Sequence, residues 1–230
     1  MTTIGILGAG QVGRTLARAS VINGYDVVIA NSRGPETLAG LVHELGPRAR
    51  SAPAAEAAAR ADFAIIAFRY TPHDRLPVDE LAGKVVLDTN NYMPGRDGIC
   101  PAVSTGQRTV HELRQEQLPT SRIAKAFSHV QHHPPLRPDT PDDALPGLFR
   151  LARPVGAPDR TALVVSSDHP DAVELVTGLY DRFGYDTVDN SPLSESWRSA
   201  PGTPMWQFSV DGQSRDELIL NLRRATHPRG

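Results

Sequence analysis

Gly8-Ala9-Gly10-Gln11-Val12-Gly13 is the stretch that decides the fold. It follows the short apolar run from Thr3 to Leu7 and opens the segment from Gln11 to Asn23, whose apolar residues recur at helical spacing. In this G-x-G-x-x-G pattern the first glycine permits a tight turn, the second lets the backbone approach a diphosphate, and the third lets the helix pack closely on the strand. The stretch therefore predicts a dinucleotide-binding turn between a strand and a helix.

The phosphates of a dinucleotide would rest on this helix, because its first backbone N–H groups and the positive end of its dipole point at the turn. The next predicted strand, Asp26 to Ala30, is followed by Asn31, Ser32 and Arg33. A site that prefers NAD carries an acidic residue here, whereas a hydroxyl and a guanidinium can donate to a 2'-phosphate. The sequence thus predicts NADPH as the cofactor, the alternative being that Arg33 is a solvated residue at a helix start.

Strands and helices alternate along the rest of the chain, which predicts an α/β fold of Rossmann type with a doubly wound parallel sheet. Further strands are expected at residues 50–52, 63–68, 84–88, 122–127, 161–166 and 186–188, and helices at 35–46, before 59, at 105–117, 170–183 and 215–224. Residues 131–158 are rich in proline and indicate a long connection or lid, and residues 190–205 a loop. We expect an NADP-binding domain over residues 1–130. Residues 131–230 would form a small C-terminal α/β domain, a second layer that completes the acceptor site and supplies a dimer interface.

The bulk composition excludes several classes of function. The 230 residues include 24 basic and 26 acidic side chains, and the net charge of -2 gives no electrostatic footprint for nucleic acid. Cys100 is the only cysteine, which rules out an intrachain disulfide and fits a reducing cytoplasm. No stretch approaches 18 apolar residues and no signal-peptide pattern opens the chain, so we expect a cytoplasmic protein that does not bind membranes.

The reacting end of the cofactor should lie beyond the carboxyl ends of the strands. The residues at these ends are Ala67-Phe68-Arg69-Tyr70, Thr89-Asn90-Asn91 and Ser128-His129-Val130. Phe68 or Tyr70 could pack on the nicotinamide ring, and the amides of Asn90 and Asn91 could bond its carboxamide or the substrate. Two asparagines before Tyr-Met-Pro-Gly are also ordinary turn chemistry, which is the alternative interpretation.

Three histidines, His129, His132 and His133, raise the question of a metal site. Two prolines follow at once and no acidic or sulfur ligand is near in sequence, so the pattern does not favour a metal. His129, closest to a predicted strand end, is the candidate proton or hydrogen-bond donor to the group that is reduced. Its alternative role is that of a polar residue that only lines the groove.

Several segments together resemble the family of NADPH-dependent reductases of coenzyme F420, the F420-dependent NADP oxidoreductases. They are the glycine turn, Asn31 to Glu36, Asp88 to Gly98, Lys125-Ala126-Phe127, and Pro192 to Trp197, and the resemblance extends from Thr3 to about Met205. It implies a Rossmann domain with a small C-terminal domain, usually dimeric, that holds NADPH and a deazaflavin face to face for direct hydride transfer. Such a transfer needs alignment more than an acid or a base, and the sequence offers no other catalytic motif.

The resemblance also assigns residues to roles. It implies that Ser32 and Arg33 hold the 2'-phosphate, that Phe68 and Asn90 border the nicotinamide, and that Ser128, His129 and Val130 face the second ring system. Ser128 stands where related chains usually have asparagine, and residues 131–146 are unusually rich in proline and histidine.

Bulky residues in the C-terminal loop keep other functions open. Trp197, Pro201 and Trp206 either shape a pocket for a smaller acceptor or pack a domain interface. One alternative is therefore an NADPH-dependent reductase of a small imine, enone or dehydroamino substrate, with His129 as the proton donor. Another is an NADPH-sensing protein without turnover.

Overall fold

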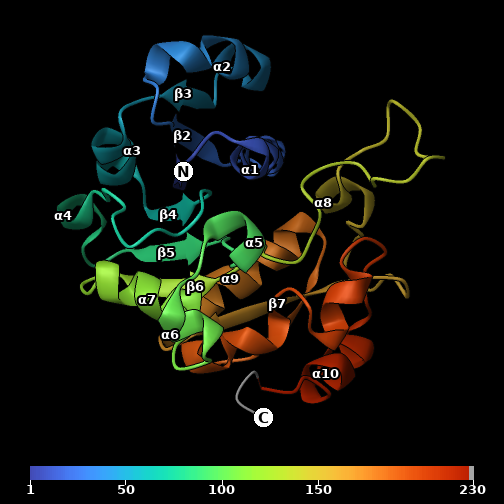
Figure 1. Ribbon diagram of the computed structural model, residues 1–230. Helices are drawn as coiled ribbons and strands as arrows, with labels where there is room; N and C mark the ends of the chain where they lie inside the picture. Colours follow the sequence, from blue (N-terminus) through green and yellow to red (C-terminus); the bar gives the residue numbers. More distant parts are fainter. Residues whose placement is uncertain (228–230) are drawn as a thin grey trace.

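The structure is a computed structural model that describes residues 1–227, and in this part of the chain eight strands form one sheet in the order β3-β2-β1-β4-β5-β6-β7-β8 (Figure 1). The strands are β1 (Thr3–Leu7), β2 (Asp26–Ala30), β3 (Ala49–Ser51), β4 (Phe63–Ile66), β5 (Val85–Asp88), β6 (Arg122–Lys125), β7 (Ala162–Ser167) and β8 (Asp186–Asp189). Neighbouring strands pair in parallel, except that β6 and β7 are antiparallel. The predicted Rossmann-type α/β fold is confirmed.

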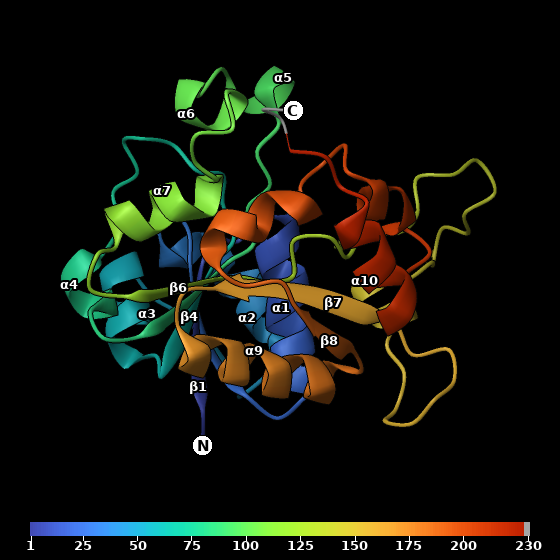
Figure 2. The ribbon, with the colours of Figure 1, turned by 90° about the horizontal axis from the view of Figure 1, so that it is seen from below.

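Helices cover both faces of this sheet. One face carries α1 (Gln11–Ile22), α2 (Ala39–Leu45), α8 (Gly147–Arg150) and α9 (Pro170–Phe183), with the 3-10 turn η1 (Pro35–Leu38) before α2. The other carries α3 (Ala54–Arg60), α4 (Val78–Leu81), α7 (Val110–Gln117), α10 (Arg215–Arg223) and the 3-10 segments η2 (Leu193–Ser199) and η3 (Pro204–Phe208). Two short helices, α5 (Pro94–Asp97) and α6 (Pro101–Ser104), lie beyond the end of the sheet opposite the N-terminus (Figure 2). None of the helices in residues 1–227 has the length and apolar character needed to cross a bilayer.

The central strands β1, β2, β4 and β5 are mostly apolar because both of their faces are buried. Leu163 and Val165 of β7 join the core beneath α1 and α9, while Ala162 and Val164 alternate with them into the core beneath α10. In β1, Gly5 brings the backbone close to α3, where a Cβ atom would lie 2.8 Å from the carbonyl oxygen of Ala57. This packing fixes the strand ends that form the site.

Some helices begin or end elsewhere than the sequence suggested. The helix expected at 105–117 begins at Val110, because Thr109 caps it. The Thr109 side chain accepts from the Glu112 backbone N–H, and the Glu112 carboxylate accepts from the Thr109 N–H at 2.7 Å. The helix expected at 35–46 is divided into η1 and α2, the proline-rich connection contains α8, and the loop at 190–205 contains η2 and η3.

The C-terminal strands do not build the second layer that we expected; they extend the first sheet. Ala124 and Lys125 of β6 pair with Ser167 and Ser166 of β7, and β8 then pairs in parallel with β7. The physical reason is that β6 would otherwise be an edge strand with unpaired N–H and C=O groups. The proposed division of the chain at residue 130 remains a prediction about folding units.

Candidate functional site

The glycine turn lies between β1 and α1, at the carboxyl end of the central strands. Gly8 has φ +110°, its N–H donates to the Ala30 carbonyl at 2.9 Å, and a Cβ atom there would lie 2.7 Å from the Ala67 carbonyl oxygen. A Cβ on Gly13 would overlap the carbonyl oxygen of Gly8. The fold itself therefore requires glycine at positions 8 and 13.

Gly10 differs from the other two glycines of the turn. Its backbone (φ -74°, ψ -168°) suits any residue, and a Cβ atom there would meet no protein atom within 4 Å. Helix α1 begins beside it at Gln11 without a side-chain cap and without an acidic residue in its first turn. Because nothing in the chain needs a glycine at this position, the open space above Gly10 fits the close approach of a diphosphate to free helix N–H groups.

A cavity of about 580 Å³ adjoins this turn, and we call it the dinucleotide cavity. Eight of the predicted site residues line it: Gly8, Ala9, Gly10, Asn31, Ser32, Arg33, Ala67 and Phe68. Gln11, Val12 and Gly13 follow directly in α1, and the Arg14 side chain braces the turn by donating to the Ala9 carbonyl at 3.0 Å. The ends of β1, β2 and β4 are thus brought together as the sequence predicted.

The loop after β2 is ordered by its own side chains. Asn31 accepts from the backbone N–H of Arg33 at 3.0 Å and donates to the Thr37 hydroxyl at 2.8 Å. Ser32 and Arg33 are exposed along this loop, and Arg33 forms no ion pair with the described residues. A hydroxyl and a guanidinium without an ion pair among the described residues therefore stand at the end of β2, and the nearby Glu36 carboxylate lies against Gly34 and does not line the cavity.

Two buried polar atoms without partners mark the ends of β5 and β6. Asn91 donates its amide N–H to the Ser128 carbonyl, which leaves Asn91 Oδ1 and Ser128 Oγ buried without a hydrogen-bond partner among the described residues. Phe127, in the left-handed region with φ 53°, turns the chain between β6 and Ser128. Since an unsatisfied buried polar atom costs about 1–3 kcal/mol, these atoms fit a ligand that both donates and accepts, as a carboxamide does.

The side chains that follow β4 take different directions. Phe68 lines the dinucleotide cavity, and the Arg114 guanidinium of α7 lies 5.4 Å from its ring centroid and 5.2 Å from that of Tyr70. Arg69 turns towards α5, where its Nη1 lies 3.6 Å from Asp97. Arg69 is therefore not brought into the cavity with its neighbours.

Beneath these rings Arg114 pairs with a carboxylate at the end of β5. Asp88 lies 3.4 Å from Arg114 Nε, and both side chains are fully buried. Burial raises the pKa of Asp88, while the Arg114 charge and hydrogen bonds to its carboxylate oppose that rise.

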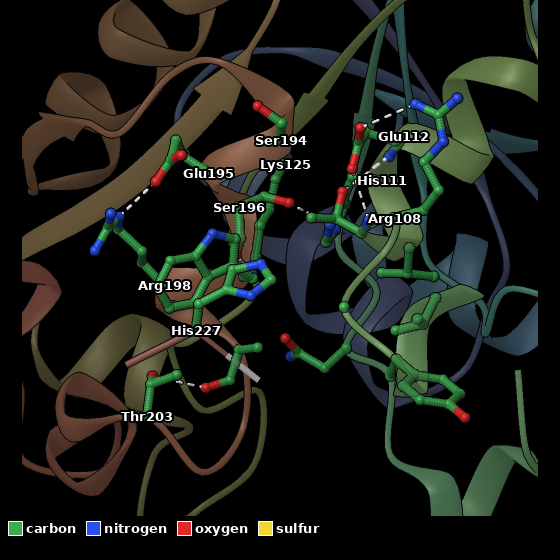
Figure 3. Close-up of a pocket in the computed structure, with 18 of the residues that line it drawn as sticks. Arg108, His111, Glu112, Lys125, Ser194, Glu195, Ser196, Arg198, Thr203 and His227 are labelled. Atoms are coloured by element: carbon green, nitrogen blue, oxygen red, sulfur yellow. Dashed lines mark hydrogen bonds and ion pairs between the residues drawn. The ribbon is translucent and has the colours of Figure 1, made fainter. Parts of the chain in front are cut away.

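A second cavity of about 640 Å³ opens between the α6–α7 region and η2 (Figure 3). Trp197 and Pro201 line it from the η2 side, Val103 and His111 from the opposite side, and Asn91 at the strand end. Trp206 does not line this cavity, because it packs against the buried residues under α10. The two cavities share no lining residue. Phe68, after β4, lines the dinucleotide cavity, and Asn91, after β5, lines the second cavity.

Buried basic groups form the floor of the second cavity. Lys125, which is labelled beside Ser196 in Figure 3, donates through Nζ to the Ser196 carbonyl at 2.9 Å. It also donates to the Ser199 carbonyl at 3.1 Å, and so holds η2 against β6. Burial lowers the pKa of Lys125 to about 7, although the charge of Asp88 opposes this. His111 lies with Nδ1 3.4 Å from Ser196 Oγ, and burial, then the charges of Lys125 and Arg114, lower its pKa well below the usual value.

His129 lies outside both cavities. Its Nε2 accepts from the backbone N–H of Val164 in β7 at 2.9 Å, and burial, followed by the charge of Lys125, lowers its pKa to about 3. With Nε2 as the acceptor, the neutral imidazole keeps its one ring proton on Nδ1, and His129 lines neither cavity in which a substrate could meet that proton. The geometry thus corrects the expectation of His129 as the proton donor: β7 pairs beside β6 and covers it.

The other two histidines are also bound to the backbone. His132 Nε2 lies 3.0 Å from the Phe127 carbonyl, and burial lowers its pKa to about 4. His133 Nδ1 lies 2.6 Å from the Pro134 carbonyl. Within residues 1–227, no three His, Cys, Asp or Glu side chains are grouped so as to hold a metal ion.

Sequence reasoning missed part of the dinucleotide cavity. Ala54, Asp74 and Arg75 line it, the last two from the segment after β4. No motif marks this segment, and the available signal was only that it follows a strand end at the carboxyl edge of the sheet.

Comparisons with known proteins agree with this geometry. Residues 3–92 match the model of the family described as NADP oxidoreductase, coenzyme F420-dependent, which confirms the family resemblance over that segment. A stretch of 53 residues is 40% identical to YjhV of Escherichia coli (strain K12), but it covers 23% of this chain and 39% of that protein. The chain thus spans about two fifths of the length of this curated relative.

Solved structures share the fold over most of the chain. SMa0349 from Sinorhizobium meliloti is similar with a TM-score of 0.66 at 26% identity, over 88% of this chain and 91% of that one. A "putative F420 dependent NADP-reductase" from Arthrobacter sp. FB24 gives 0.65 at 22% identity, over 85% and 87%. The imine reductase from Myxococcus stipitatus in complex with NADP+ gives 0.50 at 17% identity, over 84% and 56%.

Proposed function

We propose that this protein is an NADPH-dependent oxidoreductase that transfers a hydride between NADP(H) and the deazaflavin coenzyme F420. The observation that carries the cofactor assignment is Gly10, a glycine that no protein contact requires, at the uncapped start of α1. The exposed Arg33 in the same cavity supports the phosphorylated cofactor.

Isothermal titration calorimetry tests the cofactor assignment. We expect the protein to bind NADPH at least roughly tenfold more tightly than NADH, because the 2'-phosphate adds a charge-assisted contact. No uptake of NADPH, or a preference for NADH, would contradict the assignment.

The residues near the reacting end would bind and orient rather than donate protons. Asn91 Oδ1 and Ser128 Oγ, both lacking partners, are suited to a carboxamide N–H and a carbonyl oxygen respectively. NADPH supplies the hydride when it is bound. Transfer between two stacked rings depends on their distance and alignment, for which the chain provides the rigid ends of β5 and β6.

The second cavity is our candidate for the acceptor site. It begins at Asn91, at the end of β5, and lies against apolar groups of Val103, Trp197 and Pro201 that suit a flat ring system. The family description supports the deazaflavin as that ring system. Mixing the protein with NADPH and oxidised F420 should bleach the deazaflavin absorbance, and unchanged absorbance would exclude this acceptor.

A small imine, enone or dehydroamino acceptor is the second candidate. The observation that favours it is Lys125, a buried ammonium that lines the second cavity and whose pKa of about 7 suits proton donation. Hydride would add to the carbon of the double bond, and the electron pair released onto the heteroatom or enolate would take the Lys125 proton. NADPH consumption with such compounds but not with F420 would select this reading. Tight NADPH binding without consumption of NADPH by F420 or by these compounds would instead support an NADPH-sensing protein.

The family resemblance further leads us to propose a homodimer that works in the cytoplasm. Sedimentation equilibrium would give the mass of a dimer near twice 24.9 kDa, and a mass of one chain at micromolar concentration would contradict it. Fractionation of the native host tests the compartment.

A further inference from the structure

The wall of the dinucleotide cavity that the sequence did not predict carries a second arginine. Arg75 lines the same cavity as Arg33, but from the segment after β4 instead of the loop after β2. Both side chains belong to exposed residues, and neither forms an ion pair with another residue in 1–227. Two guanidinium groups with open donors therefore border one cavity.

The carboxylate beside Arg75 is bound by another arginine, which also pairs with Asp88. Asp74, the one acidic residue among the described residues that line this cavity, accepts from Arg114 Nη1 at 2.8 Å. Arg114 is fully buried, so this pair is screened from solvent and salt. Arg33 and Arg75 are the charged side chains of this cavity without an ion-pair partner among the described residues, which favours a ligand group with more than one negative charge.

Helix α7 holds the segment of Arg75 in place. Gln117 donates to the Thr71 carbonyl at 2.7 Å, and Thr71 donates through its backbone N–H and hydroxyl to Asp74 at 3.0 and 2.7 Å. Arg114 and Gln117 are joined to each other at 2.8 Å. The backbone next to Arg75 is thus tied to a helix, so a ligand that binds Arg75 has to order its side chain but not the loop that carries it.

We infer that Arg75 is a second specificity-determining residue of this site, which grips the 2'-phosphate of NADPH together with Arg33. The inference rests on the proposed cofactor and deepens it. The diphosphate has its own partners at Gly10 and the start of α1, whereas the 2'-phosphate, a dianion with three acceptor oxygens, can bind two guanidinium groups from opposite sides. One arginine alone would leave part of these acceptors to water.

The test compares Arg75→Ala, Arg33→Ala and the double variant in calorimetric titrations with NADPH, NADH and adenosine 2',5'-bisphosphate. Arg75→Ala should weaken NADPH and the bisphosphate about tenfold or more and NADH less than about twofold. Arg75→Lys should recover part of the loss, because an ammonium keeps the charge but not the fork of donors.

Arg215→Ala is the matched control. Arg215 is also an exposed arginine without an ion pair among the described residues, but it opens α10, which packs on β7 and β8 at the far end of the sheet. This variant should bind all three ligands as the wild type does. Since Arg75 and Arg215 are both exposed, neither change should alter the melting temperature, which is measured beside the titrations.

The outcomes distinguish a failure of the role of Arg75 from a failure of the proposed function. Unchanged NADPH affinity in Arg75→Ala, or equal losses for NADPH and NADH, would overturn the role of Arg75; equal losses would place it on the adenine or the diphosphate instead. If wild type itself binds neither NADPH nor the bisphosphate, the proposed function fails first. If wild type binds NADPH and only Arg33→Ala weakens it, the function stands and this inference falls.

Discussion

Gly13 of α1 and Gly8 of the preceding turn pack backbone to backbone, so that a Cβ atom on Gly13 would overlap the carbonyl oxygen of Gly8. Gly10 lies between them and has no such neighbour. The fold therefore requires glycine at positions 8 and 13, whereas at position 10 we expect the bound ligand to require it.

Gly10→Ala should fold normally and lose the cofactor. Its backbone angles suit alanine, and alanine is a poorer helix N-cap than glycine, so the free energy of unfolding should fall by about 1 kcal/mol. NADPH affinity should drop at least about a hundredfold, about 3 kcal/mol, because the methyl group occupies the space of the diphosphate. Denaturant titration and calorimetry measure the two effects. Gly13→Ala is the control and should destabilise the fold itself.

Arg33→Ala should discriminate between the two nicotinamide cofactors. A charged donor to a phosphate contributes about 1.5–3 kcal/mol, so the affinity for NADPH should fall roughly ten- to a hundredfold. NADH lacks the 2'-phosphate, and its dissociation constant should change little. Equal losses for both cofactors would show that Arg33 does not contact this phosphate.

His129→Phe should cost stability and spare the chemistry. The variant leaves the Val164 N–H without its acceptor in a buried strand, which costs about 1–3 kcal/mol of unfolding free energy. With NADPH and the acceptor saturating, kcat below the melting transition should remain within about threefold of wild type. A loss of kcat by orders of magnitude in a folded variant would return His129 to the active site.

Stability should decrease as the pH falls from about 6.5 to 4. Burial holds the pKa of His129 at about 3 and of His132 at about 4 in the folded state, below the ordinary value near 6.5 in the unfolded state. The unfolded chain therefore binds more protons in this window, and each such histidine lowers the unfolding free energy by up to about 1.4 kcal/mol per pH unit. Denaturant titrations at several pH values measure the slope. In His129→Phe the slope should correspond to the uptake of about one proton fewer on unfolding. An unchanged slope would contradict the lowered pKa of His129.

Trp197→Ala should affect the acceptor and not the cofactor. The indole lines the second cavity, with the Arg198 guanidinium 4.4 Å from its centroid, so its removal should raise the acceptor KM roughly tenfold and leave the NADPH KM unchanged. Trp206→Ala provides the comparison, since that ring packs under α10 and its loss should lower the melting temperature instead. A changed NADPH KM in Trp197→Ala would place the acceptor elsewhere.

Features that depend on neighbouring residues in the sequence could be predicted from it. The eight strands, the glycine turn and the position of Arg33 beside it follow from apolar runs, turn residues and helix starts that lie close together in the chain. The capping box of Thr109 and Glu112 is also a local pattern, and it marks the start of α7 at Val110 more accurately than the predicted helix start at residue 105.

Contacts between distant segments could not be read in this way. His129 is sealed by Val164, 35 residues further on, and Lys125 is bonded to Ser196, 71 residues away. Both contacts depend on the side of β6 to which β7 attaches and on its antiparallel direction, which no short motif specifies. For the same reason Arg75 was missed: its segment lines the same cavity as Arg33 and is tied through Asp74 to Arg114, a helix residue distant in the sequence.

The antiparallel pairing of β6 with β7 also limits how this molecule can move. The sheet continues from β3 to β8 through two residue pairs between β6 and β7, Ala124 with Ser167 and Lys125 with Ser166, so a hinge opening between these strands would have to break those pairs. Motion that keeps these pairs intact falls to the surface segments beyond the carboxyl edge, which include the stretch with Arg75 and the short helices α5 and α6.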